Sequence, residues 1–531
     1  MNLNRRDFLR QLGFGAAGLT VAATLPTTGW TLPAKTSKLP RSLPEAQGVA
    51  PRGLLDFVNT IEAQKLNVHS MMVVRHGQVV AEGWWAPYAP QYKHTLYSLS
   101  KSFTSTAVGM AVAEKKLTVD DKVVSFFTKD VPATVSENLA AMSVKDLLTM
   151  STGHDKDTTP ALRGAGTDSN WVKSFLAQPV EHKPGTFFVY NSGATYMLSA
   201  IVQHLTGQTV LEYLKPRLFG PLGIEGEDWE VSPQGINTGG WGLRLRTEDI
   251  AKFGQLYLQK GIWNRKRLVA ESWINDATRA EVQSKGGKGD ASVNDWIQGY
   301  GYQFWRCRND AYRGDGAFGQ YCIVLPKEDA VVAITSETAN MQAVLDAVWK
   351  HILPALQRVG LPAERVEQAA LTKKLSTLTL LPESTQPAST VASQISGKTY
   401  TIADNPMHVK DVSLTFGKDG CIFKLQDDQG PHQVLCGVNR WAESTTTFAV
   451  APLMLTPTPV PGDQARKVAG SGSWQDPNTF VMVWRFIETA HYDMVTCRFG
   501  SEGVQVEFQS SLSLVNKTKD KRPVLEGKMM A

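Results

Sequence analysis

The sequence predicts an α/β domain followed by a separate all-β domain. Strand-like segments stand at both ends of the first part of the chain, with largely helical patterns between them, so one sheet is expected to draw its strands from distant positions. Beyond about residue 395, short alternating runs and turn signals replace the helical patterns, which is typical of a barrel or a sandwich. The chain has 531 residues, enough for two or three domains.

The composition is that of an ordinary globular protein. A hydrophobic content of 42% with 20% charged residues excludes a disordered or fibrous chain. The net charge of +5 is small for this length, and no dense run of Lys and Arg stands beside aromatic residues. Nucleic acid is therefore not expected as a partner.

Residues 1–35 are expected to be a targeting segment. Arg5 and Arg6 precede a mild apolar stretch over residues 12–25 that is rich in Gly and Ala, an order that resembles a twin-arginine export signal. The stretch is too short to span a bilayer comfortably, although a chance arginine pair before an amphipathic helix is the alternative. Cleavage of this signal would leave a periplasmic protein with no stable membrane span.

Residues 36–365 are expected to form the first domain. The domain begins with an alternating segment, residues 68–85, that turns at His76 and Gly77 and predicts a β-hairpin. Residues 299–336 return to strands broken by Gly and Asp turns. Apolar spacings of three and four predict helices over residues 102–114, 144–150, 194–205, 247–259 and 341–356.

The second domain is expected over residues 395–520. The preceding stretch, residues 366–394, is rich in Ser, Thr and Pro, as a linker would be. Nearly everything after it alternates in short runs, which predicts a β-barrel or sandwich of ordinary domain size.

Five cysteines are spread over both domains without the spacing of a zinc site. Cys307 and Cys322 flank one expected hairpin, and Cys421 and Cys436 flank another, so export would permit two local disulfides. Because the number is odd, buried free thiols are the expectation for most of them.

Ser98 and Lys101 stand at the head of an apolar helical run and allow two interpretations. In the first, Ser98 is an ordinary helix cap and Lys101 is solvated. In the second, the three-residue spacing lets the amine of Lys101 reach the hydroxyl of Ser98 on one helix face. The small-residue face that follows, residues 102–112, would then bury the lysine and lower its pKa, so that neutral amine is available as a base.

Two further segments suit a cleft. Tyr190, Asn191 and Ser192 fill a polar gap between a Pro-Gly turn and the start of a helix, although a tyrosine there could equally be a core residue. Residues 314–319 place three glycines at the start of a strand, which often marks close approach of a ligand to the backbone, or else a simple hairpin turn.

Together these segments resemble the serine hydrolases of the class C β-lactamase-like and penicillin-binding-protein-like superfamily, nearest its esterase and 6-aminohexanoate-dimer hydrolase branch. The resemblance covers residues 43–356. It implies a β-lactamase-like domain, with an antiparallel sheet flanked by helices plus a helical subdomain, and acyl transfer without a cofactor. The ordered matches include YSLSKSFTS, VKDLLTMSTGHD, PGTFFVYNSGATYMLSAIVQHLTG, GGWGLRLRTEDIAKFGQLYLQKG and RGDGAFGQYCIVLP.

The resemblance implies a role for each matching residue. Ser98 would be the acylated nucleophile, Lys101 its base, and Tyr190 the group that carries the proton to the leaving group. The oxyanion would lie between the backbone N–H of Ser98 and one on the strand after Gly316, for which we choose Ala317.

The chain departs from the family in two places that bear on substrate. Penicillin-recognising members carry Lys-Thr-Gly or His-x-Gly on that strand, whereas this chain has Asp315 between two glycines. A buried anion beside an anionic substrate disfavours β-lactam turnover, unless Arg313 supplies the charge through an alignment shifted by one. The asparagine expected two residues after the tyrosine is also displaced, since Asn191 comes one after it and Ser192 two after it.

The polar segment over residues 154–171 is expected to be a loop over the cleft mouth. Its Asp168 and Trp171 would select the acyl or the amine side of the substrate, or else fill the surface. Other chemistries have less support, because the sequence contains no H-E-x-x-H metal motif and no G-x-S-x-G elbow.

The expected function is therefore an exported serine hydrolase that cleaves a carboxylester or a small amide, with no metal and no cofactor. β-Lactams and D-amino-acid peptides, through D-aminopeptidase or D-Ala carboxypeptidase activity, are the alternative substrates. The alternative class is a sensor or binding protein that is acylated once or not at all. That alternative predicts Tyr190 in the core, or Lys101 charged and paired with a carboxylate.

Overall fold

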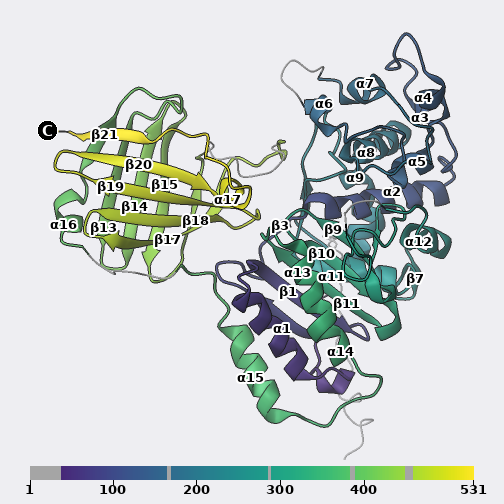
Figure 1. The fold of residues 1–531 in the computed structure, drawn as a ribbon, viewed down its shortest axis with the longest axis horizontal. Coiled ribbons are helices and arrows are strands. Elements are labelled where there is room, and N and C mark those ends of the chain that lie inside the picture. The colour runs from purple at the N-terminus through teal and green to yellow at the C-terminus, as the bar shows by residue number, and fades with distance from the viewer. Residues whose placement is uncertain (1–37, 164–168, 285–288, 383–388, 449–457, 531) are drawn as a thin grey trace, which may run out of the picture. The chain divides into compact units, whose positions relative to one another are not determined.

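The computed structural model describes residues 38–163, 169–284, 289–382, 389–448 and 458–530 (Figure 1). The expected targeting segment and Asp168 lie outside these residues. The described residues from 38 onward belong to one compact unit.

The first domain is built on a six-stranded antiparallel sheet in the order β2-β1-β11-β10-β9-β8. This confirms the expected α/β class and the sheet drawn from both ends of the domain. The strands are β1 (Val68–Arg75), β2 (Gln78–Trp84), β8 (Trp305–Arg306), β9 (Tyr312–Gly316), β10 (Gln320–Leu325) and β11 (Ala330–Ser336). Two small antiparallel sheets join β3 (His94–Thr95), β4 (Asp228–Trp229) and β5 (Leu243–Leu245), and β6 (Ile262–Trp263) with β7 (Lys266–Arg267).

Helices cover both faces of this sheet, so its central strands are buried on both sides. Met71 and Val73 of β1 join a cluster with α1 (Pro51–Ala63), α13 (Met341–Ala347) and α14 (Leu353–Ala355). The alternate residues Met72 and Val74 join the larger cluster on the other face, which contains α11 (Thr247–Leu258). Side chains that alternate between two cores explain why these strands are apolar without interruption.

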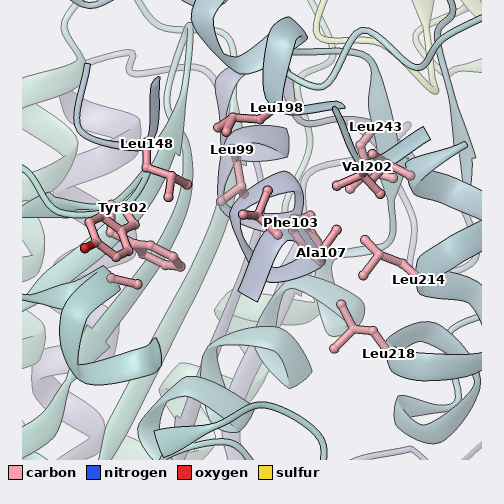
Figure 2. Close-up of a cluster of buried hydrophobic side chains, with 14 of the residues drawn as sticks. Leu99, Phe103, Ala107, Leu148, Leu198, Val202, Leu214, Leu218, Leu243 and Tyr302 are labelled. Atoms are coloured by element: carbon pink, nitrogen blue, oxygen red, sulfur yellow. The ribbon is translucent and has the colours of Figure 1, made fainter. Parts of the chain in front are cut away.

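The helical subdomain lies between β2 and β8 in the chain, and α2 (Ser100–Ala113) runs along its edge next to the sheet. Leu99, Phe103 and Ala107 project from this helix and its start into a cluster with Leu198 and Val202 (Figure 2). Every residue of α2 from Ser100 to Ala111 is buried. The other helices here are α3 (Val123–Phe126), α4 (Glu137–Ala141), α5 (Val144–Leu148), α6 (Thr159–Arg163), α7 (Trp171–Leu176), α8 (Ser192–Thr206), α9 (Val210–Leu214), α10 (Gly220–Leu222) and α12 (Glu271–Thr278).

The stretch expected to be a linker contains two helices, α15 (Arg365–Ser376) and α16 (Val391–Ile395). Leu371 of α15 is buried in the same cluster as α1, so this helix belongs to the packing of the first domain. The linker prediction is therefore wrong for the residues of α15. The Ser-, Thr- and Pro-rich composition that suggested a linker is found in the residues after this helix.

The C-terminal domain is a closed β-barrel, which resolves the expected choice between barrel and sandwich. Within the described residues, nine strands pair in the order β15-β14-β13-β12-β21-β20-β19-β18-β17, and a parallel pairing of Cys436 with Gly470 closes β15 onto β17. They are β12 (Thr399–Ile402), β13 (Asp411–Gly417), β14 (Gly420–Asp427), β15 (Gly430–Val438), β17 (Arg466–Asp476), β18 (Thr479–Phe486), β19 (Tyr492–Phe499), β20 (Gly503–Ser510) and β21 (Leu525–Met529), with β16 (Ala442–Thr446) beside β17 and a helix α17 (Ser511–Val515).

All five cysteines are buried free thiols. Within the described ranges, no helix has both the length and the apolar character that a membrane span requires. The same residues contain no cluster of three or more His, Cys, Asp or Glu side chains arranged for a metal ion.

Candidate active site

Ser98 lies in a short 3₁₀ turn (Tyr97–Leu99) directly before α2. Leu99 occupies the N-cap position of α2 and makes no capping side-chain bond, so Ser98 is not the helix cap. Its Oγ lies 3.0 Å from Nζ of Lys101, one helical turn further along the chain. The three-residue spacing therefore brings the hydroxyl and the amine together as the second interpretation expects.

Lys101 is 1% exposed, and its Nζ makes three hydrogen bonds. It bonds Ser98 Oγ, Ser192 Oγ at 2.9 Å and the carbonyl oxygen of Gly240 at 2.8 Å. None of these partners is charged. Burial lowers the pKa of Lys101 to about 7, although Asp157 and Asp315 act in the opposite direction. A substantial fraction of this amine is therefore neutral at pH 7.

Tyr190 faces the same two groups. Its ring centre lies 4.9 Å from Nζ of Lys101, and its hydroxyl hydrogen-bonds Ser98. Trp305 stacks on the ring at 5.3 Å. Burial, with a contribution from the Asp315 carboxylate, raises the pKa of Tyr190 well above its usual value, so the phenol keeps its proton throughout the neutral range.

The two residues after Tyr190 have different environments. Asn191 is fully buried as the N-cap of α8, where its Oδ1 accepts from the backbone N–H groups of Gly193 and Ala194. Ser192 presents its hydroxyl to Lys101, while its backbone N–H donates to Asp157 Oδ1 at 3.0 Å. Of the two, Ser192 is the one whose side chain the structure brings to Lys101.

The end of β9 lies directly against the turn that carries Ser98. A Cβ added at Gly316 would lie 2.0 Å from the Leu96 carbonyl oxygen and 3.1 Å from the Ser98 nitrogen, so only glycine permits this approach. Ala317 follows immediately. The backbone at the end of β9 therefore lies close to the backbone of Ser98, as an oxyanion hole made from both segments would require.

Asp315 is buried and paired on its own strand. Arg313 donates from Nε to Asp315 Oδ2 at 2.8 Å, and is itself fully buried against Cys307 and the carbonyl oxygens of Asp295 and Arg306. Burial raises the pKa of Asp315, while the Arg313 charge opposes that shift. The guanidinium is thus occupied inside the protein and does not replace the cation of Lys-Thr-Gly.

Trp171 is the first residue of α7 and is 4% exposed. It packs edge-on against Tyr196 at 5.3 Å and lies 6.2 Å from Trp241. Trp241 directly follows Gly240, the carbonyl partner of Lys101, so Trp171 reaches the site through this neighbour.

Three site residues went unassigned at the sequence level: Asp157, Gly240 and Trp305. Gly240 lies in the GGWG segment, which matches the family but did not indicate that the Gly240 carbonyl bonds Lys101. Trp305 carries no local signal, because its contribution depends on a contact with Tyr190 from another part of the chain. Asp157 lies in the segment expected over the cleft mouth, but that pattern did not predict its contact with the Ser192 backbone.

Comparison with known proteins agrees with this arrangement. The sequence profile of the family described as Beta-lactamase matches residues 57–357, more than half of the chain. The chain belongs to the beta-lactamase family. As a member of the beta-lactamase family it is a serine hydrolase, and the matched residues include Ser98, Tyr190 and Asp315.

Relatives within the family have different names. A 6-aminohexanoate-dimer hydrolase of Paenarthrobacter ureafaciens is 24% identical over 50% of this chain and 71% of its own length. A beta-lactamase of Escherichia coli K12 is 23% identical over 58% of this chain and 95% of its own. A solved structure from Bacillus anthracis, provisionally named a 6-aminohexanoate-dimer hydrolase, matches with a TM-score of 0.50 at 21% identity, over 62% of this chain and 89% of its own. This structural likeness establishes the fold.

Proposed function

We propose that Ser98 is the nucleophile of an acyl-transfer reaction that hydrolyses a carboxylester or a small amide. One observation carries the proposal: a buried lysine with a pKa near 7 bonds Ser98 and otherwise only uncharged partners. A lysine kept for stability would be expected to carry a charge and to pair with a carboxylate. This lysine can instead accept a proton at neutral pH.

In the first step, Ser98 Oγ attacks the substrate carbonyl and its proton passes to Nζ of Lys101. The negative charge on the carbonyl oxygen is stabilised by the backbone N–H groups of Ser98 and Ala317. Tyr190 donates its phenol proton to the departing oxygen or nitrogen and regains one from Lys101. The bond to the leaving group breaks, and the acyl group remains on Ser98.

In the second step, water attacks the acyl-enzyme and the same groups act in the opposite direction. Lys101 and Tyr190 take the proton of the water, the bond from the carbonyl carbon to Ser98 Oγ breaks, and the proton returns to that oxygen. The products are a carboxylic acid and a free enzyme, so no cofactor enters the proton or electron balance.

The substrate class follows from the charge at the end of β9. By the sequence resemblance, Asp315 stands where penicillin-recognising enzymes present a cation, and Arg313 is paired with Asp315. A substrate carboxylate at this place would meet an anion instead of a cation. The relative named 6-aminohexanoate-dimer hydrolase supports an ester or amide without a carboxylate near the scissile bond.

The sensor alternative has less support. It requires Lys101 to be charged and paired with a carboxylate or Tyr190 to point into the core. Lys101 has three uncharged hydrogen-bond partners, and the Tyr190 hydroxyl bonds Ser98. Because Lys101 and Tyr190 are arranged to transfer protons in both acylation and deacylation, turnover is favoured over a single acylation.

The decisive experiment is intact-protein mass spectrometry after brief exposure to a fluorophosphonate and to p-nitrophenyl butyrate. We expect a covalent adduct and steady nitrophenol release in the wild type, and neither in Ser98→Ala. The matched control is Ser102→Ala, one helical turn from Ser98 on the buried side of α2, where the hydroxyl donates to the Gln303 carbonyl.

The same enzyme should turn over the nitrophenyl ester much faster than the β-lactam nitrocefin. Absence of an adduct in the wild type would refute the nucleophile assignment. Efficient nitrocefin hydrolysis would refute the substrate class while leaving the nucleophile in place.

Export to the periplasm belongs to the same proposal and is supported by Arg5 and Arg6 ahead of a short apolar stretch. Replacing both arginines with lysine should retain the protein in the cytoplasm, because twin-arginine signals depend on the guanidinium pair. Fractionation of cells that express either form measures this directly. Equal periplasmic amounts of the two forms would refute the twin-arginine route.

A further inference from the structure

The residue directly before Ser98 packs against the C-terminal barrel. Tyr97 is 4% exposed and lies in a cluster with Phe318, Ala490 and Leu512. Ala490 directly precedes His491, which leads into β19, and Leu512 lies in α17, so both come from the C-terminal domain. The side chain next to the nucleophile is therefore buried by a different domain from the one that holds the nucleophile.

A buried hydrogen-bond chain anchors the Tyr97 hydroxyl. Tyr97 bonds Nε2 of His491, and Nδ1 of His491 lies 2.6 Å from Oε1 of Glu337. Ser511 donates its hydroxyl to the same carboxylate oxygen. Because the carboxylate accepts the Nδ1 proton, it fixes the imidazole with Nε2 toward Tyr97. His491 and Ser511 come from the barrel domain, whereas Glu337 directly follows β11 of the first domain.

The second candidate oxyanion donor is held by the same cluster. Phe318 directly follows Ala317 and meets Tyr97 edge-on at 5.6 Å and His491 at 5.2 Å. Both N–H groups, those of Ser98 and Ala317, therefore have a chain neighbour in contact with His491.

Backbone conformation gives an independent reason for such support. Tyr97 has φ of +46° and Phe318 has φ of +66°, in the left-handed region that non-glycine residues rarely adopt. Bulky aromatic residues remain there only where the surrounding structure holds them, and such positions cluster at active sites. Here the surrounding structure includes His491.

We propose that His491 is a positioning residue of the active site, through which the C-terminal barrel holds the two backbone N–H groups of the oxyanion hole. The inference rests on the proposed function, since it gives Ser98 and Ala317 their roles. His491 touches no reacting atom. It acts by fixing Tyr97 and Phe318, and a small displacement of oxyanion donors lowers the rate strongly.

The test compares Tyr97→Phe, His491→Ala and His491→Gln with a matched control, His432→Ala. His432 is also a buried histidine of the barrel that bonds a carboxylate, Asp427, at 2.9 Å, and among the described residues its hydrogen-bond partners, Asp427 and Thr447, both belong to the barrel. The readouts are kcat and KM for p-nitrophenyl butyrate, and inhibition by an alkyl trifluoromethyl ketone, which forms a tetrahedral adduct with an oxyanion on the nucleophile.

We expect Tyr97→Phe and His491→Ala to lower kcat about 10-fold or more, with little change in KM, because removal of a whole oxyanion donor costs about 100-fold or more. The ketone should bind more weakly by a similar factor. His491→Gln, which can place an amide where Nε2 stood, should recover part of the loss. His432→Ala should keep wild-type kcat even if it lowers the melting temperature.

A kcat within about two-fold of wild type in both Tyr97→Phe and His491→Ala would overturn the inference. An equal loss of kcat in His432→Ala would also overturn it, since the effect would then reflect the stability of the barrel. If His491→Ala does not fold, Tyr97→Phe decides alone, because it removes a single hydroxyl. Failure of the proposed function would instead appear as absence of Ser98-dependent turnover in the wild type.

Discussion

Lys101→Met is expected to lower kcat for a nitrophenyl ester by about 1000-fold or more, because the variant loses the general base and, with it, the activation of Ser98. Methionine matches the length of the lysine stem and fills the same buried space. The amine is the group next to Ser98 Oγ whose pKa lies near neutrality, so no other side chain of the site takes its place. Steady-state kinetics on purified wild type and variant measures this.

The pH profile of the wild type distinguishes base catalysis from a purely structural lysine. With a pKa of about 7, Lys101 loses its proton as the pH rises, so kcat/KM should increase through pH 7 and then level off. Burial raises the pKa of Tyr190 above its usual value, so no alkaline decline is expected below about pH 10. A profile that is flat from pH 5 to pH 9 would contradict the assignment of Lys101.

Stability provides a second measurement on the same variant. The folded pKa of Lys101 is about 7 and the unfolded value is 10.5, so between these two pH values the unfolded chain binds one more proton. The free energy of unfolding of the wild type should therefore rise relative to Lys101→Met by up to about 1.4 kcal/mol per pH unit over that window, and stay constant below it. Urea unfolding at pH 6.5, 8 and 9.5 measures this difference.

The matched control for both measurements is Lys252→Met. Lys252 is also buried in the first domain, but it pairs with Asp249 at 3.5 Å and bonds the Gly223 carbonyl. This variant should keep its activity. A pH-independent stability difference between wild type and Lys101→Met would mean that Lys101 stays charged in the folded protein.

Tyr190→Phe is expected to lower kcat by about 100-fold, within the range for loss of a positioned proton donor. Phenylalanine keeps the stacking on Trp305 and removes only the hydroxyl that bonds Ser98. The loss should be larger for an amide than for a nitrophenyl ester, because nitrophenolate leaves without a proton whereas an amine does not. Parallel kinetics on p-nitrophenyl butyrate and on butyramide or an anilide reports both effects.

Tyr257→Phe is the control for this substitution. Its hydroxyl is also buried and bonds Thr106 at 2.8 Å on the far part of α2. It should leave kcat unchanged for both substrate types. An equal loss for ester and amide in Tyr190→Phe would argue that Tyr190 positions Ser98 and does not donate to the leaving group.

Local patterns in the sequence were sufficient for much of the architecture. The alternation around Gly77 predicts the β1–β2 hairpin, and the apolar spacing predicts α8 and α11 to within a few residues. Helix geometry alone brings Ser98 and Lys101 to one face, because three residues make nearly one turn. These properties depend only on neighbours in the chain, which is why the sequence by itself determined them.

Tertiary structure decided the chemistry of those residues. The pKa of Lys101 depends on burial by segments around Ser192 and Gly240, about 90 and 140 residues away, and no local pattern reports it. Asn191, which was expected to bind substrate, is instead buried as the cap of α8, and Thr158 from another part of the chain also donates to its Oδ1. The contact of His491 with Tyr97 joins residues almost 400 positions apart, since burial and hydrogen bonding are summed over neighbours in space and not along the chain.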